Sequence, residues 1–195
     1  MKTIIISLKI FLFLTILTGI VYPVLITCIA QVVFPGNANG SLVFKDNKAV
    51  GSELIGQTFD STIYFSSRPS ATGYNPLPSG GSNFGLSNSK LINQVSERKS
   101  QFLSFNSLDS LTVLPSEMLF ASASGLDPHI SPEAAMLQTD RIVKMRHLDN
   151  NQKDQLLSEI KKLTEAPQLL CLGENRINVL ILNLELDKID NINNK

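Results

Sequence analysis

The longest pattern in the chain is an apolar run from Ile10 to Phe34 that contains no charged side chain. At about 1.5 Å of rise per residue, a helix over this run crosses roughly 30 Å of hydrocarbon, the thickness of a bilayer core. A surface helix of a soluble domain keeps a polar face, and this run has none. We therefore expect a short N-terminal segment at 1–9, a transmembrane helix at 10–34 and one domain at 35–195.

The charges beside the run predict its orientation. Lys2 and Lys9 are the only charges before it, and the next charge is Lys45. Positive residues tend to stay on the cytoplasmic side, so we expect the N-terminus inside the cytoplasmic (inner) membrane and residues 35–195 outside it. A cleaved signal has a shorter apolar region, and a lipidated Cys28 would lie too deep along the run. An uncleaved single-pass anchor is the favoured hypothesis.

Pro23 lies inside the run and removes one backbone donor, so it predicts a kink in the helix. Thr18 and Gly19 precede it and would let another helix approach closely. Tyr22 and Pro23 could instead form a local bend that has no partner. Packing against a partner helix is the favoured interpretation, because a lone anchor does not need a bend.

After a linker at 35–40, short apolar groups predict weak strands or extended segments at 41–44 and 54–59. Residues 63–65 are a better strand candidate, because they are β-branched and aromatic. Residues 69–86 are rich in Pro, Gly and Ser and lack periodicity. Long segments of this kind are usually functional or disordered, and we expect an ordered surface loop.

Helix signals are clearer beyond this loop. Apolar residues at helical spacing predict a helix over residues 88–105 and another that begins near Asn151 and stops before Pro167. Between them, Ser131, followed by proline and glutamate, is a helix start, and that helix should run to about Arg146.

Two further segments are predicted to be strands. Residues 118–123 form a short apolar group, and residues 178–186 are almost continuously apolar, which is typical of a strand covered on both faces. The tail after Asp187 is Asn-rich and should be frayed. The expected fold is α+β, with one N-terminal transmembrane helix followed by a small-sheet extracytoplasmic domain with about three helices.

Composition narrows the functions. The formal net charge is zero, so nothing in the charge favours nucleic acid as a partner. The two cysteines, Cys28 in the span and Cys171 in the domain, are not expected to meet. A domain of this size can bury a sufficient core without a disulfide.

Motifs for phosphate and metal chemistry are absent or weak. No segment matches a P-loop, and residues 80–85 have glycines without the lysine, so they read as a turn-rich loop. The histidines, His129 and His147, and the cysteines show no ligand spacing. Asp127 and His129 lie around a proline, which favours a hydrogen-bonded corner over a ligand pair.

Ser124, Asp127 and His129 have the residue types of a hydrolytic triad. Triads assemble from separate segments, and the chain has no G-x-S-x-G elbow. Three charged residues beside apolar segments are expected to form ion pairs: Arg68, Glu174 and Arg176. These observations indicate a domain that docks and performs no covalent chemistry.

Several phrases together carry a family resemblance. They are Gly51–Gln57, Tyr64–Asn83 with a gap after Ala71, Ala121–Ala135, and Gly173–Val179, behind a span with Thr18-Gly19 and Tyr22-Pro23. In this order they closely resemble the C subunit of the bacterial Kdp potassium-transporting ATPase. The resemblance covers nearly the whole chain and is weakest in residues 93–116 and after Asp187.

The resemblance implies partners. They are a P-type ATPase subunit that hydrolyses ATP, a channel-like potassium-binding subunit and a very small membrane subunit. It implies no cofactor bound by this chain, since ATP and K⁺ are handled by the complex. The family is described as a catalytic chaperone that raises the ATP affinity of the hydrolytic subunit, partly because Ser79, Gly80 and Gly81 resemble a signature loop of transporter ATPases. The predicted topology puts this loop outside the cytoplasm, so we favour assembly and support of the ion-entry side over nucleotide binding.

The residues expected to serve assembly or partner contact are Gly19, Tyr22, Pro23, Arg68, Pro69, Tyr74, Asn75, Asn83, Asp127 and His129. Two functions of other classes stay open. One is an anchored extracytoplasmic hydrolase that uses Ser124, Asp127 or His129. The other is a module that binds a small ligand in the 69–86 loop. A Gly80→Val substitution is expected to disturb that loop, because valine disfavours glycine-like backbone angles.

Overall fold

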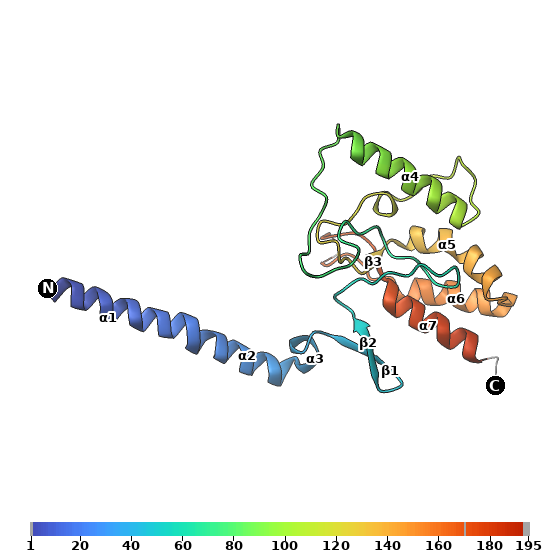
Figure 1. Cartoon of the computed structure of the whole chain (residues 1–195). Coiled ribbons are helices and arrows are strands. Elements are labelled where there is room, and N and C mark those ends of the chain that lie inside the picture. The colour runs from blue at the N-terminus through green and yellow to red at the C-terminus, as the bar shows by residue number, and fades with distance from the viewer. Residues whose placement is uncertain (1, 170, 193–195) are drawn as a thin grey trace. The chain divides into compact units, whose positions relative to one another are not determined.

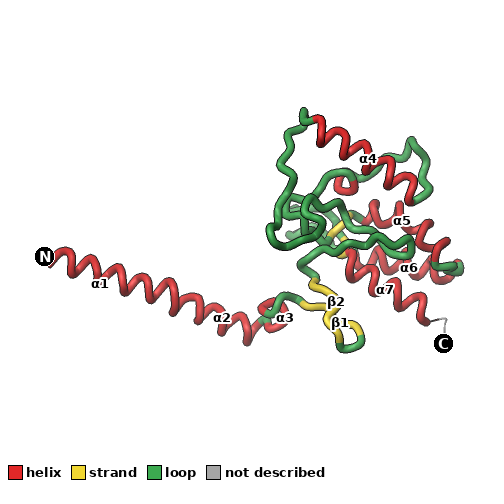
Figure 2. The backbone as a smooth tube through the Cα atoms, viewed as in Figure 1, coloured by secondary structure: helices red, strands yellow, loops and turns green. Residues whose placement is uncertain are grey.

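The computed structural model describes residues 2–169 and 171–192, and it divides the chain into two compact units (Figure 1). The first unit extends to Ser52, and the second begins at Glu53. Helices dominate and the strands are short (Figure 2), so the α+β prediction is confirmed.

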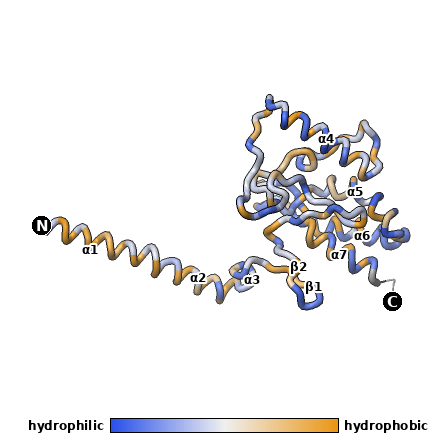
Figure 3. Tube along the Cα trace, in the orientation of Figure 1, coloured by the Kyte–Doolittle hydropathy of each residue, from blue (hydrophilic) through white to orange (hydrophobic). Residues whose placement is uncertain are grey.

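The first unit contains a continuous helical stretch, Lys2–Val33. It consists of α1 (Lys2–Ile16), a π-helical turn (Leu17–Val21) and α2 (Tyr22–Val33). None of its residues is buried in the structure, and Figure 3 shows hydrophobic residues along its length. By length and composition it can cross a membrane. It begins before the predicted span of 10–34 and ends one residue short of it.

The π-helical turn lies just before Pro23, which has no N–H to donate. Within the turn, the N–H of Tyr22 donates to the carbonyl of Leu17, five residues back. Single π-helical turns of this kind insert one residue into an α-helix and reset its hydrogen-bond ladder. The helix runs on past Pro23 without a sharp bend (Figure 1), so the predicted kink is wrong and a π-helical turn takes its place.

The first unit ends in a hairpin. The short helix α3 (Pro35–Ala38) follows α2, and β1 (Leu42–Lys45) then pairs with β2 (Lys48–Ser52) in an antiparallel ladder. This pairing confirms the extended segment predicted at 41–44.

The second unit holds most of the secondary structure. Its longer helices are α4 (Ser89–Phe105), α5 (Pro132–Met145), α6 (Asn150–Leu163) and α7 (Val179–Ile192). Its sheet is a two-stranded pair, β3 (His129–Ile130) with β4 (Ile177–Asn178), and a 3₁₀ turn covers Ser116–Met118. Helix α6 packs against both α5 and α7. The core draws on all four helices and on Phe65, Leu114, Met118, Ile130 and Ile177.

Capping side chains explain why three helices begin where the sequence predicts. The Asn88 side chain accepts a hydrogen bond from the Lys90 N–H, and Ser131 accepts one from the Ala134 N–H at 3.1 Å. Asp149 starts α6 with a capping box. The predicted helices at 88–105, at 131–146 and from about 151 are therefore confirmed.

The strand predicted at 178–186 is wrong, because only Asn178 belongs to a strand, β4, and residues 179–186 are the first part of α7. An apolar run alone cannot separate a buried strand from a buried helix. The Asn178 side chain accepts from the N–H groups of Leu180 and Ile181, so it starts the helix as a cap. The helix continues to Ile192 and buries Ile189, so the frayed tail predicted after Asp187 is wrong for residues 188–192, and residues 193–195 lie outside the described residues.

The strands predicted at 63–65 and 118–123 are also wrong, and at 54–59, where a weak strand or an extended segment was predicted, the structure has no strand. At 63–65 the reason is visible, because side-chain amides take the place of a partner strand. The Phe65 N–H donates to Asn183 Oδ1 at 2.8 Å, and Asn183 Nδ2 donates to the Phe65 carbonyl at 3.0 Å. Gln138 Oε1 accepts from the next N–H, at 2.7 Å. The backbone polar groups of this segment are therefore satisfied without a strand ladder.

Candidate functional site

Three loops of the second unit meet at one place, which we call the loop junction: residues 56–57, 66–81 and 122–129. Backbone hydrogen bonds join them. The Gly56 N–H donates to Leu126 O at 2.8 Å, and the Gly80 N–H donates to Ser124 O at 2.9 Å. These loops come from three of the phrases that carry the family resemblance, so phrases distant in the sequence form one structure.

Ser70 holds the centre of the loop junction. Its hydroxyl donates to Gly125 O at 2.7 Å and accepts from the Tyr74 N–H at 2.9 Å and the Thr72 N–H at 3.2 Å. One side chain thus ties the turn at 70–74 to the turn at 125. The prediction of an ordered 69–86 loop is supported at this end by these hydrogen bonds.

Two glycines are required by this packing. Gly125 has a φ of +71°, and a Cβ at this position would lie 2.6 Å from Thr72 Oγ1. At Gly56 a Cβ would lie 2.6 Å from the Asp127 carbonyl oxygen. By contrast, a Cβ at Gly80 meets nothing within 4 Å and its φ is not positive, so the expected strain of Gly80→Val is not supported by the structure.

A triplet of ionisable side chains lies on the loop junction. Arg68 donates to Asp127 Oδ2 at 2.6 Å, and Asp127 Oδ1 accepts from the His129 N–H at 3.0 Å and contacts His129 Nδ1 at 3.3 Å. Burial alone would raise the pKa of Asp127, but the hydrogen bonds from His129 and Arg68 lower it from 3.8 to about 2. The corner predicted for Asp127 and His129 is confirmed, and so is the ion pair predicted for Arg68.

Tyr74 closes the loop junction on one side. Its hydroxyl donates to the backbone carbonyl of Arg68, and its backbone has a φ of +61°. Burial raises the pKa of Tyr74, with the nearby Ser67 and Arg68 acting in the opposite direction. The ring therefore stays neutral and serves as a packing and hydrogen-bonding group.

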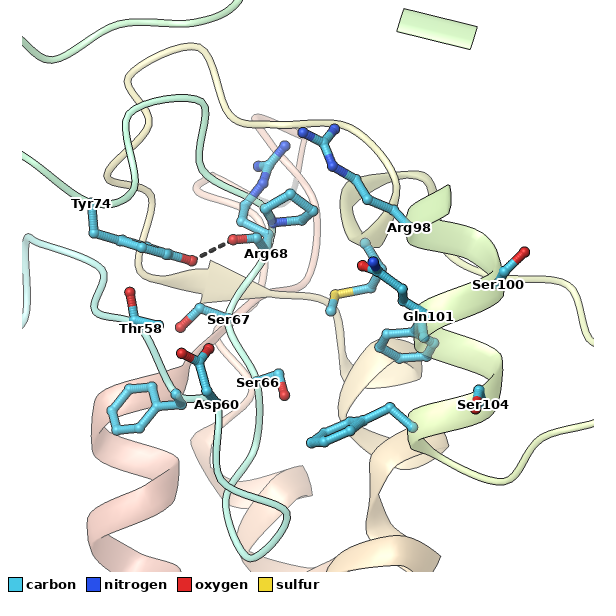
Figure 4. Close-up of a pocket in the computed structure, with 15 residues that line it drawn as sticks. Thr58, Asp60, Ser66, Ser67, Arg68, Tyr74, Arg98, Ser100, Gln101 and Ser104 are labelled. Atoms are coloured by element: carbon cyan, nitrogen blue, oxygen red, sulfur yellow. Dashed lines mark hydrogen bonds between the residues drawn. The ribbon is translucent and has the colours of Figure 1, made fainter. Parts of the chain in front are cut away.

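An open groove of about 770 Å³ borders the loop junction (Figure 4). Its apolar lining includes Phe102 and Phe105 from α4 and Met118 from the 3₁₀ turn. Figure 4 shows the guanidinium groups of Arg68 and Arg98 at the same end of the groove. Apolar surface with cationic groups at one end suits the binding of a chain segment or small ligand.

The structure does not assemble a hydrolytic triad from Ser124, Asp127 and His129. The exposed Ser124 hydroxyl accepts from the Leu126 N–H at 3.1 Å, and within the described residues no hydrogen bond joins it to His129. A serine nucleophile needs a base within hydrogen-bond reach. In the same described ranges, no group of three or more His, Cys, Asp or Glu residues could hold a metal ion.

The segment Ser79-Gly80-Gly81 lacks the geometry of a phosphate loop. The Gly80 N–H is already used by Ser124, and a Cβ on Gly81 would lie 3.3 Å from Ala123 O, so the segment packs on its own chain. The next helix begins only at Ser89, so no helix N-terminus follows directly to supply further N–H groups.

The other predicted residues take structural or separate positions. Asn75 accepts from the Leu77 N–H in a turn, and Asn83 has a φ of +54°. Arg176 pairs with Glu165 at 2.9 Å, which confirms its predicted ion pair, whereas no ion pair is found for Glu174 among the residues described. Pro69 O accepts from the Ser122 N–H within the loop junction. Gly19, Tyr22 and Pro23 belong to the other unit.

Sequence reasoning missed the buried side chain that bonds the backbone of residues 62–64, just before the loop junction. Arg141 on α5 donates to the carbonyls of Thr62 and Tyr64 and to Asn106 Oδ1, and it lies over the Phe105 ring at 4.4 Å. Burial lowers the pKa of Arg141 to about 10. The sequence signal that could have found Arg141 is the position of a charged residue on the apolar face of a predicted helix.

The helical stretch and the loop junction define a class: within the described residues, the chain has one candidate membrane span, followed by a second unit whose loops are joined by hydrogen bonds. Residues 4–188 match the family described as "K+-transporting ATPase, c chain". The chain is 46% identical to the potassium-transporting ATPase KdpC subunit of Pectobacterium atrosepticum, over 93% of this chain and 94% of that protein. The KdpC subunits of Photorhabdus laumondii and Geotalea uraniireducens are also 46% identical, over 94% and 92% of this chain and 94% of each protein. The chain therefore belongs to the KdpC family of potassium-transporting ATPase subunits.

Proposed function

We propose that the chain is a non-catalytic accessory subunit of a high-affinity, ATP-driven potassium uptake complex in the cytoplasmic (inner) membrane. The match to the KdpC family over residues 4–188 carries this proposal. In it, a P-type ATPase subunit hydrolyses ATP, a channel-like subunit selects potassium, and a very small subunit completes the complex. This chain supplies assembly and stimulation of the hydrolytic subunit.

In this proposal the apolar helix crosses the membrane once, with Lys2 and Lys9 on the cytoplasmic side. The second unit then lies outside the cytoplasm, on the ion-entry side. The loop junction and its groove supply the docking surface there, since they combine partly buried hydrogen bonds with open apolar lining.

Stimulation of ATP hydrolysis then acts through assembly, without nucleotide contact by Ser79, Gly80 and Gly81. Two observations support this view: the Gly80 N–H is already bonded to Ser124 O, and the first helix after this segment, α4, begins only at Ser89. A photoreactive labelled ATP added to the intact complex should modify the hydrolytic subunit alone. Modification of this chain at or near Ser79 would overturn the proposed division of roles.

The accessory role is tested by pull-down of the tagged chain from membranes, with growth at very low potassium as the second readout. Arg68→Met should lower partner recovery and growth, because Arg68 joins Asp127 to the groove. Lys153→Met is the matched control, since it removes an exposed ion pair to Asp140 at 2.7 Å, and neither residue lines the groove. Unaltered high-affinity uptake in a strain lacking the gene would end the proposal.

A further inference from the structure

The hairpin of the first unit carries an exposed apolar face. Leu42 and Phe44 lie two residues apart on β1, and they are 52% and 61% exposed. The ladder is irregular between Val43 and Phe44, but the extra residue, Val50, lies on β2, so the alternation along β1 continues and both side chains point to the same side. Opposite Phe44 the ladder places the small residue Ala49, which leaves the aromatic ring uncovered. Two large apolar side chains thus stand together on one face.

A two-stranded hairpin with an exposed apolar face is stabilised when another apolar surface covers that face. Among the described residues its sheet has two strands, and a two-stranded hairpin is marginally stable by itself in water. Asp46 and Asn47 form a tight turn with φ values of 49° and 60°, which fixes the ladder but adds no apolar cover.

Hydrogen bonds tie the base of the hairpin to the end of the apolar helix. Asn39 Nδ2 donates to Pro35 O at 2.7 Å, and the Asn39 side chain also contacts that of Gln31 on α2. At the C-terminal end of β2, which is also at the base of the hairpin, the Ser52 hydroxyl donates to Gly40 O at 2.6 Å. The hairpin is therefore joined to α2 by a short, bonded connection within one unit.

The position of this connection identifies the occupant of the apolar face. If Lys9 marks the inner boundary, about 20 residues of helix at 1.5 Å each fill roughly 30 Å of hydrocarbon, so the outer boundary falls near Ala30. The hairpin then begins in the headgroup region of the outer leaflet. Aromatic and aliphatic side chains are stable at that depth, and lysines such as Lys48 can keep their charge in water while their stems lie along the surface.

We propose that Leu42 and Phe44 insert into the outer boundary of the bilayer, so that the hairpin is an interfacial anchor beside the span. This inference rests on the single-pass insertion in the proposed function. The occupant is lipid acyl chain and headgroup, not a partner protein. The anchor would limit how far the second unit, which follows β2 directly, can move from the membrane.

The chain contains no tryptophan, so a single introduced tryptophan reports its own surroundings. The full chain with Phe44→Trp is reconstituted into phosphatidylcholine–phosphatidylglycerol vesicles that contain brominated lipid. Its emission should shift to the blue and should be quenched more strongly by shallow bromines than by deep ones. Leu42→Trp should behave in the same way, which guards against a local effect of one substitution.

Two further variants make the outcome decisive. Val113→Trp is the control in the second unit, where the native side chain is 89% exposed, and it should show water-like emission without quenching. Val24→Trp lies in the apolar helix and should be quenched by deep bromines. If Val24→Trp is quenched but both hairpin variants match Val113→Trp, the anchor is refuted and the span stands. If Val24→Trp is not quenched, the single-pass insertion itself fails, and the anchor fails with it. Hairpin emission that is blue-shifted but insensitive to brominated lipid would show that the side chain is buried against protein, in this chain or in a second copy of it, and would refute lipid as the occupant.

Discussion

Asn183 provides the sharpest test of how the loop region is held. Its side chain is 3% exposed and bonds both polar groups of Phe65, a residue that is fully buried. Asn183→Leu keeps a side chain of similar size and removes both hydrogen bonds. The Phe65 N–H and carbonyl are then left buried without their partner on α7.

The expected loss follows from the cost of unsatisfied groups. Each buried backbone group without a partner costs about 1–3 kcal/mol, so the two groups together cost about 2–6 kcal/mol. The leucine adds apolar burial that offsets roughly 1–2 kcal/mol of this cost. The difference gives a fall in the free energy of unfolding of roughly 0–5 kcal/mol, centred on about 2.5 kcal/mol. Asn93→Leu, at an exposed position of α4, is the matched control and should stay within about 0.5 kcal/mol.

Urea unfolding of the full chain in detergent micelles, followed by far-UV circular dichroism, measures the change in stability. Hydrogen exchange supplies a local readout, because the Phe65 amide should lose protection in Asn183→Leu and keep it in Asn93→Leu. If Asn183→Leu unfolds at the wild-type urea concentration and its Phe65 amide stays protected, side-chain amides do not replace a strand here.

Three other predictions concern separate features. Gly125→Ala should unfold at lower urea than wild type, whereas Gly80→Ala should not, because only the first has a positive φ and a crowded Cβ position; equal midpoints would contradict the packing of the loop junction. The pKa of Asp127 is lowered from 3.8 to about 2, so its stabilising contribution is complete above about pH 4 and is lost as the pH falls towards 2. Asp127→Asn should therefore flatten that part of a stability profile measured by urea midpoints, and an unchanged profile would show that Asp127 gains nothing from its partners. Pro23→Leu should restore a regular α-helical hydrogen-bond ladder at the π-helical turn. It should lower the yield of intact complex on affinity purification more than it lowers the stability of the second unit. A yield equal to that of wild type would refute a role for this turn in assembly.

The helices could be predicted because their signals are local. Ser131 and Asn88 cap their helices with their own side chains, and the apolar spacing behind them continues for several turns. The segment at 178–186 could not be assigned from its apolar run alone. Its helical signals were Asn178 as a cap and the continuation of the apolar spacing to Ile189. The strand prediction at 63–65 failed for another reason, since the backbone of this segment is hydrogen-bonded by side chains on helices that are distant in the sequence.

The candidate site was predicted in part. The corner at Asp127 and His129 and the ion pair of Arg68 follow from residues close to prolines and apolar segments, and both are confirmed. Gln138 and Arg141 were missed, because their roles depend on which loop packs over α5. A polar residue on the apolar face of a helix signals a buried polar group, but it does not show which distant segment that group will bond.

The most direct test of the central claim is the side of the membrane on which the loop junction lies. Cys28 and Cys171 are first replaced by serine, and the exposed Ser79 is then changed to cysteine in the full chain. A membrane-impermeant thiol reagent should label Ser79→Cys in whole spheroplasts and leave it unlabelled in sealed inside-out vesicles. Labelling in inside-out vesicles only would put the second unit in the cytoplasm, where ATP is available, and would contradict the proposed docking role on the ion-entry side.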